Sequence, residues 1–103
     1  MMKPNILFLV IDSLRSDKCY GNKKTSITPH IDNLRKSGVY FEQAISSVAS
    51  TGIAMSSIFT GLFPSNMGMS GSNFTVLDSN IPNFIKFFKE NGYSVFATAP
   101  EIA

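Results

Sequence analysis

The sequence has few of the residues that a disulfide, a histidine-rich site or a membrane span requires. One of its 103 residues is cysteine, Cys19, so no disulfide can form within the chain and an oxidising compartment is not implied. The single histidine, His30, follows Pro29 at a predicted helix start, and we interpret it as structural rather than as a metal ligand. No apolar run approaches the roughly 20 residues of a membrane span.

The apolar run nearest the N-terminus, residues 6–11, is also too short for a signal peptide and has no small-residue cleavage site behind it. It is followed instead by Asp12, Arg15 and Asp17, which suits the end of a strand. We therefore expect a cytoplasmic protein that does not contact a membrane.

Charge is also scarce, at 16% of residues and a net charge of +2, and the basic residues are scattered. This gives no electrostatic support for nucleic-acid binding. A hydrophobic content of 44% is typical of a globular chain, and 103 residues allow one small domain with a modest core.

Predicted strands and helices alternate along the chain. Branched and apolar residues predict strands at 6–11, 39–44 and 93–97. Helices are predicted at three places, each with start and stop signals: residues 28–38, 53–59 and 79–92. Residues 13–24 and 65–79 are predicted loops. This order predicts an α/β fold with a mainly parallel sheet and helices on both faces.

Three predicted strands would leave open sheet edges. We therefore interpret the chain as the front part of a larger fold. Phe84, Phe87 and Phe88 cannot all face one small core, which predicts a sticky surface and self-association through an exposed sheet edge.

Asp12 follows the first predicted strand directly. Ligands of open α/β sheets bind beyond the carboxyl ends of the strands, and a lone carboxylate there suits a hard metal ion. Asp12 could equally cap the following turn through local hydrogen bonds, and both interpretations stay open. Arg15 and Asp17 are expected to form a surface ion pair, and Lys23 and Lys24 a solvated loop tip.

Thr51 stands where a predicted helix begins, and the free amides and positive dipole end of a helix favour an anion there. A threonine hydroxyl becomes a nucleophile when a metal or a base lowers its pKa. The alternative is that Thr51 is only the N-cap, although Ser50 could supply the cap and leave Thr51 for chemistry. Met55, Met67 and Met69 are expected to fill gaps in the packing.

Several segments together resemble the N-terminal part of the sulfatase and alkaline-phosphatase superfamily. Residues 4–17, PNILFLVIDSLRSD, resemble the opening strand of that family with its Asp and Leu-Arg-x-Asp. Residues 28–34, TPHIDNL, and 38–44, GVYFEQA, are similar to its Thr-Pro-Asn-Leu-Asp-x-Leu and Gly-x-x-Phe-x-x-Ala. Residues 60–69, TGLFPSNMGM, resemble the block that follows the nucleophile, and counting back from this block places the nucleophile at Thr51.

The resemblance implies an alkaline-phosphatase-like three-layer sandwich, of which residues 1–103 are an incomplete N-terminal portion. It implies that Asp12 and Thr51 contact a divalent metal, zinc, manganese or calcium, and that the substrate is a small-molecule sulfate or phosphate ester. True sulfatases carry Cys or Ser at the nucleophile position, with Pro and Arg beyond it, and oxidise that residue to formylglycine. This chain has Thr51, Ile53 and Met55 there, and Ser13 replaces a second acidic residue. The pattern is similar to threonine-nucleophile phosphodiesterases of the superfamily.

The metal ligands that the family draws from later in its chain have no match in this sequence. One carboxylate and one hydroxyl would hold a metal weakly, so we expect the 103 residues alone to be inactive. The alternative to an enzyme portion is a sulfatase-like remnant without activity. A nucleotide-binding module ranks third, because no Gly-rich phosphate loop follows the first predicted strand.

Overall fold

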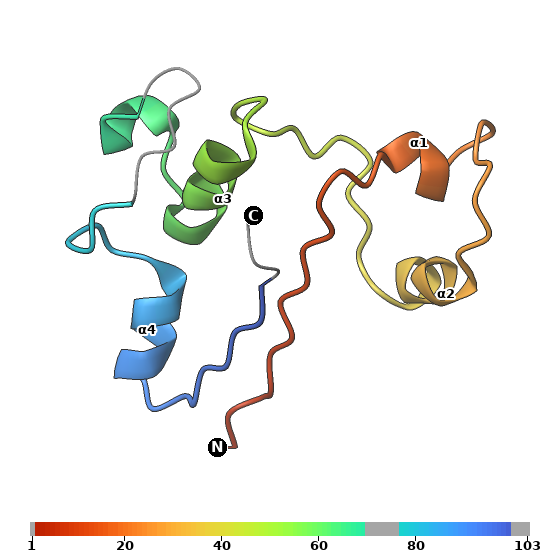
Figure 1. Ribbon diagram of the computed structural model, residues 1–103. Helices are drawn as coiled ribbons and strands as arrows, with labels where there is room; N and C mark the ends of the chain where they lie inside the picture. Colours follow the sequence, from red (N-terminus) through yellow and green to blue (C-terminus); the bar gives the residue numbers. More distant parts are fainter. Residues whose placement is uncertain (1, 70–76, 100–103) are drawn as a thin grey trace. The chain divides into compact units, whose positions relative to one another are not determined.

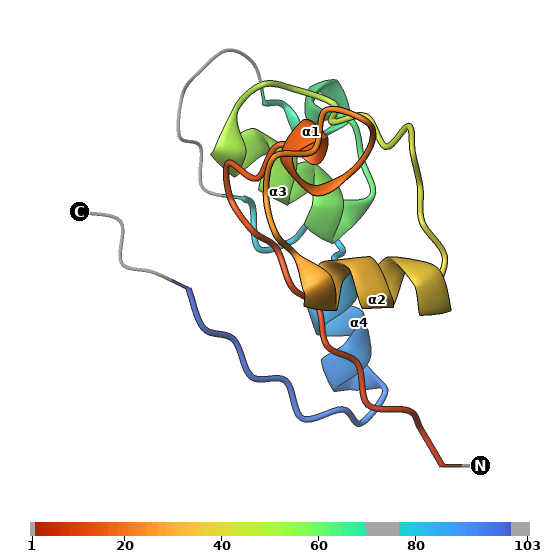
Figure 2. The same ribbon diagram turned by 90° about the vertical axis from the view of Figure 1, so that its right-hand side faces the viewer.

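The computed structural model describes residues 2–69 and 77–99, which form two compact units, Met1–Ala44 and Ile45–Ala103. Figures 1 and 2 show the chain from two directions; we describe each unit by itself. Regular structure within the described residues is helical throughout.

In the first unit the chain runs as an extended trace through residues 2–11 to α1, Ser16–Cys19, and then to α2, Pro29–Ser37 (Figure 1). The predicted helix at 28–38 is confirmed, with Thr28 and Gly38 as its caps. The loop predicted for residues 13–24 is wrong at Ser16–Cys19, where a single helical turn forms. That turn closes with a hydrogen bond from the Tyr20 amide to the Ser16 carbonyl at 2.9 Å.

An ion pair fastens the loop between α1 and α2 to α2. The Lys24 ammonium donates to both carboxylate oxygens of Asp32, at 2.6 and 2.7 Å, and both side chains are half-buried. The expectation of a solvated loop tip is therefore wrong for Lys24, although Lys23 is exposed. This contact joins residues eight positions apart in the sequence, so no local sequence pattern predicts it.

The second unit is built around α3, Thr51–Thr60, which packs against the 3₁₀ helix η1, Pro64–Met67, and against α4, Phe84–Glu90. The predicted helix at 53–59 is confirmed. The buried apolar side chains of the second unit, among the described residues, are Ile53 and Met69, at 3% and 5% exposure. The Phe59 and Phe84 rings, 5.2 Å apart, join α3 to α4. Met69 thus fills the packing as expected.

Helix α4 is shorter than the predicted helix at 79–92. The Asp78 carboxylate accepts from the Asn80 amide at 2.8 Å, which forms a turn instead of a helix start. Asn83 then caps α4 by accepting a hydrogen bond from the Lys86 amide at 3.0 Å. Phe87 is 59% exposed, which confirms that the three phenylalanines do not all face one core.

The predicted strands are not paired within the described residues. Residues 6–11, 39–44 and 93–97 carry no ladder of hydrogen bonds, and Leu7 is 88% exposed. Residues 6–11 and 93–97 run as extended traces in both views (Figures 1 and 2). A strand is defined by its partner, so an extended segment without one is not assigned as a strand. The three-layer α/β sandwich therefore stays a prediction, as does self-association through a sheet edge.

No helix among the described residues is long and apolar enough to cross a membrane. The longest of these helices, α3, has 10 residues, whereas a span needs about 20. The expected cytoplasmic location stays a prediction.

The cap of α4 yields a first prediction. We expect Asn83→Ala to destabilise α4 by about 1 kcal/mol, because the Lys86 amide loses its acceptor. Helical ¹³Cα shifts and slowed amide exchange over residues 84–90 should weaken in the variant. The control Asn83→Asp keeps a capping oxygen and should retain both signals. Equal helicity in the Ala and Asp variants would show that the cap does not stabilise α4.

The Lys24–Asp32 pair yields a second prediction. The hydrogen bond from Lys24 holds the pKa of Asp32 below its ordinary value of 3.8. The folded carboxyl binds its proton less tightly than the unfolded one. The resulting stabilisation is therefore complete above pH 3.8 and is lost as the pH falls through the lower folded pKa.

A ¹³C titration of the Asp32 carboxyl checks this. We expect Lys24→Gln to raise the Asp32 pKa and to leave the titration of Asp17, which pairs with Arg15, unchanged. An Asp32 pKa that does not respond to Lys24→Gln would remove the ion pair as its cause.

Candidate functional site

Asp12 ends the extended segment at residues 2–11 and presents an exposed carboxylate at the start of a tight turn. The next residue, Ser13, has a φ of 58°, the left-handed region that side chains other than glycine rarely adopt. The Ser13 hydroxyl lies 3.5 Å from the Asp12 carboxylate, a long contact for such a bond. Among the described residues no backbone amide donates to Asp12, so no such hydrogen bond supports the interpretation of Asp12 as a turn cap.

Arg15 and Asp17 form the surface ion pair that the sequence predicts. The Arg15 guanidinium donates through Nε and Nη2 to the two Asp17 carboxylate oxygens, at 2.9 and 3.1 Å. These hydrogen bonds lower the pKa of Asp17 and raise the pKa of Arg15. Both side chains are exposed, so solvent screens the pair and it stabilises the turn after Asp12 only weakly.

Thr51 is the first residue of α3 and not its N-cap. Ser50 occupies the N-cap position, with extended backbone angles of −140° and 125°, and its side chain makes no capping hydrogen bond. Within the described residues the exposed Thr51 hydroxyl forms no hydrogen bond. The cap interpretation therefore does not hold for Thr51, and its hydroxyl is available for other partners.

The N-terminus of α3 is suited to an anion. Its first helical hydrogen bond runs from the Ala54 amide to the Ser50 carbonyl at 2.8 Å, so the amides of residues 51–53 precede it. The first turn contains no acidic side chain. Unsatisfied amides and the positive end of the helix dipole both favour a negatively charged group at this end.

The body of α3 holds Thr51 in place. Ile53, which stands where true sulfatases carry proline, is one of the two buried apolar side chains of the described chain. At the other end Gly61 has a φ of 71° and its amide donates to the Ser57 carbonyl at 2.8 Å, which ends the helix. The Thr60 hydroxyl lies 3.2 Å from the Met67 sulfur, which connects this end to η1.

The two candidate residues lie in different units: Asp12 in the first and Thr51 in the second. A shared metal ion therefore stays a prediction. Across residues 2–69 and 77–99, no group of three or more His, Cys, Asp and Glu side chains is placed to hold a metal. His30 is exposed on α2, and its expected structural role stays a prediction.

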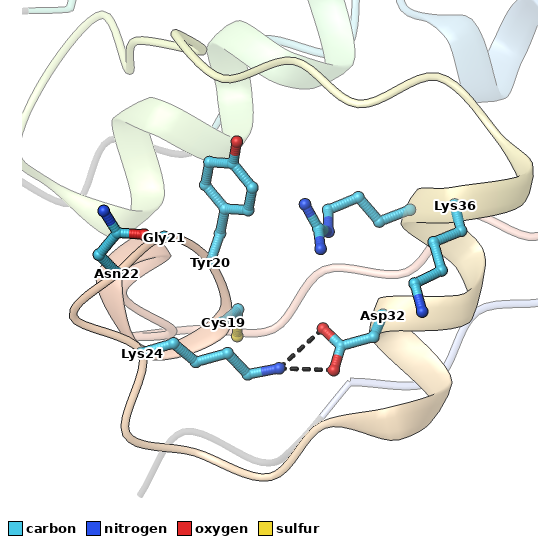
Figure 3. A pocket seen from close by; sticks show the side chains of 8 residues that line it. Cys19, Tyr20, Gly21, Asn22, Lys24, Asp32 and Lys36 are labelled. Carbon is cyan, nitrogen blue, oxygen red and sulfur yellow. Dashed lines mark hydrogen bonds and ion pairs between the residues drawn. The ribbon is translucent and has the colours of Figure 1, made fainter.

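The first unit contains a pocket that the sequence did not predict. It has a volume of about 380 Å³ and lies between the 19–24 segment and α2, with Lys24, Asp32, Arg35 and Lys36 in its lining (Figure 3). The only sequence signal was the spacing of Asp32, Arg35 and Lys36, which places charged residues within one turn of a predicted helix.

Comparison with known proteins identifies the family. The profile of the family described as Sulfatase matches residues 4–101. An ulvan-active sulfatase of Formosa agariphila is 36% identical over 95 residues, covering 90% of this chain and 19% of the relative. An N-acetylgalactosamine-6-O-sulfatase of Bacteroides thetaiotaomicron is 34% identical, covering 89% and 19%, and iduronate 2-sulfatase of Mus musculus is 35% identical, covering 86% and 16%.

The chain thus spans less than a fifth of the length of these curated relatives. No solved structure matches it. The family profile covers nearly the whole sequence, as the motif resemblance does, and both correspond to the N-terminal part of the family. The chain belongs to the sulfatase family.

Proposed function

We propose that this chain contributes the nucleophile and one metal ligand to a sulfatase-like hydrolase or transferase that acts on sulfuric or phosphoric esters. Thr51 is the nucleophile and Asp12 the ligand. The observation that carries the proposal is the state of Thr51: an exposed hydroxyl at the first position of α3, with no hydrogen bond among the described residues and with Ser50 at the N-cap.

The chemistry of the two side chains fits a divalent cation such as zinc, manganese or calcium. A carboxylate and a hydroxyl are oxygen donors, and both Asp12 and Thr51 are exposed. Such a cation, when bound, lowers the pKa of a hydroxyl that coordinates it. Two donors are fewer than a tight site needs, so the proposal requires further ligands besides Asp12 and Thr51.

Thr51 acts directly in this mechanism and not through an aldehyde. Its hydroxyl loses a proton to solvent, and Oγ1 bonds to phosphorus or sulfur as the bond to the leaving alcohol breaks. The amides at the start of α3 donate hydrogen bonds to the negatively charged oxygens of the transferred group. Water or another alcohol then displaces Thr51 from the covalent intermediate. Formylglycine chemistry is not proposed, since the position holds neither Cys nor Ser.

The proposed substrate class includes both sulfuric and phosphoric esters, although the relatives are named as sulfatases. The curated relatives are named as sulfatases, which supports a sulfuric ester as the substrate. A direct threonine nucleophile resembles the phosphodiesterases of the superfamily, which supports a phosphoric ester. We expect the 103 residues alone to be inactive, because the described residues contain no complete metal-ligand cluster.

A third prediction tests Thr51. In a longer polypeptide that contains this chain, we expect divalent-metal-dependent hydrolysis of p-nitrophenyl sulfate or of bis(p-nitrophenyl) phosphate. Thr51→Ala should reduce kcat by about a hundredfold or more, because the attacking oxygen is removed. Ser50→Ala, at the N-cap, is the matched control and should keep most of the activity, since its side chain makes no capping bond.

Mass spectrometry of a quenched reaction should locate the transferred group on the peptide that contains Thr51. Full activity in Thr51→Ala, or transfer to another residue, would contradict the assigned role.

A further inference from the structure

The pocket beside α2 holds more positive than negative charge. Lys24, Arg35 and Lys36 line it, together with one carboxylate, Asp32 (Figure 3). The Lys24 ammonium is already paired with that carboxylate at 2.6 Å. Within the part of the chain that the structure describes, neither Arg35 nor Lys36 has an ion-pair partner. The two remaining cations therefore face a pocket whose only carboxylate is neutralised.

Aromatic rings fix the Arg35 guanidinium in one orientation. Its central carbon lies 4.6 Å from the centre of the Tyr20 ring and 5.6 Å from that of Tyr40, and the two rings are 4.7 Å apart. Stacking of this kind attracts a cation to the face of the ring while leaving its N–H donors free to point outward. The cation is thus held in position before any ligand binds.

The Glu42 carboxylate pairs with Tyr20. Glu42, in the segment at residues 39–44, accepts a hydrogen bond from the Tyr20 hydroxyl at 2.5 Å. This hydrogen bond raises the pKa of Tyr20 above its ordinary value of 10.0. The contact holds the Tyr20 ring against Arg35 and makes Glu42 a partner of the tyrosine rather than of the guanidinium.

Arg35 also lacks a hydrogen-bond acceptor. Its Nε atom is buried and has no partner among the described residues. A buried donor without an acceptor is unfavourable, so native proteins nearly always supply one from the chain, from water or from a ligand. A guanidinium that lacks an acceptor suits an oxyanion, because Arg binds such groups through two parallel N–H bonds.

We propose that this pocket binds the sulfate or phosphate group of an anionic ligand through Arg35 and Lys36. Two positive charges balance a dianion, and the guanidinium fork and the ammonium together offer donors to several of its oxygens. The volume of about 380 Å³ leaves room for such a group. The site lies within the first unit and does not depend on Thr51.

The test uses the 103-residue chain labelled with ¹⁵N. Inorganic sulfate and inorganic phosphate are titrated in separately, with chloride keeping the ionic strength constant. We expect a saturable shift of the Arg35 Nε–Hε resonance and of the amides at the end of α2, with either oxyanion and not with chloride alone. The tighter of the two identifies the group that the pocket prefers.

Two variants locate the binding. Lys36→Gln, at an exposed side chain, should weaken the affinity about tenfold, because one charged donor is lost. Arg35→Lys keeps the charge but removes the planar fork, and should weaken it by a similar factor. Lys89→Gln in α4, which lies in the second unit, makes the same change in net charge and should leave the affinity unchanged.

The helical ¹³Cα shifts of α2 show whether each variant keeps its fold, and Lys36→Gln carries the comparison should Arg35→Lys disturb the stack. Equal affinity in Lys36→Gln and Lys89→Gln would overturn the proposal, because the effect would then be one of net charge. No saturable shift with either anion would also overturn it. Thr51→Ala should bind the anions as the parent chain does, so failure of the proposed active site leaves this result unaffected.

Discussion

Hydrogen bonds, ion pairs and ring contacts stabilise each unit, because little apolar surface is buried among the described residues. Ile53 and Met69 are the buried apolar side chains of the described residues, and none of these residues has a large, fully buried side chain. In the first unit the Lys24–Asp32 pair and the Arg35 stack take over the role that a core has elsewhere. Such contacts are worth less than the burial of apolar side chains, and solvent screens them.

The elements that could be predicted from the sequence are those set by residues close together in the chain. Residues at the ends of the helices, such as Thr28 and Gly61, predict the helices at Pro29–Ser37 and Thr51–Thr60. Their bounds follow start and stop residues, such as Pro29 at the first helical position and the left-handed Gly61 after the last, which a sequence displays directly. The Arg15–Asp17 pair was predictable for the same reason, since its partners are two positions apart.

The features that were missed depend on tertiary contacts. Lys24 was assigned to a solvated tip because its partner, Asp32, lies eight positions later in the sequence, in another element, α2. The stack of Arg35 on Tyr20 joins residues fifteen positions apart, and no periodicity reports it. Helix α4 begins later than its apolar stripe suggests. Asp78 forms a turn with Asn80, and the Asn83 side chain takes the Lys86 amide, which an earlier helix would pair with the carbonyl four residues before it.

Residues 6–11 show where the sequence and the described structure still differ. A continuous apolar run is typical of a strand buried on both faces, yet every side chain in this run is at least 45% exposed. Burial of such a run requires neighbouring strands on each side, and the described residues contain no strand. The position of Asp12 depends on the same requirement, because a carboxylate at the end of an unpaired segment has no fixed direction. A sheet that paired residues 6–11 would thus both bury the run and determine whether Asp12 reaches the hydroxyl of Thr51.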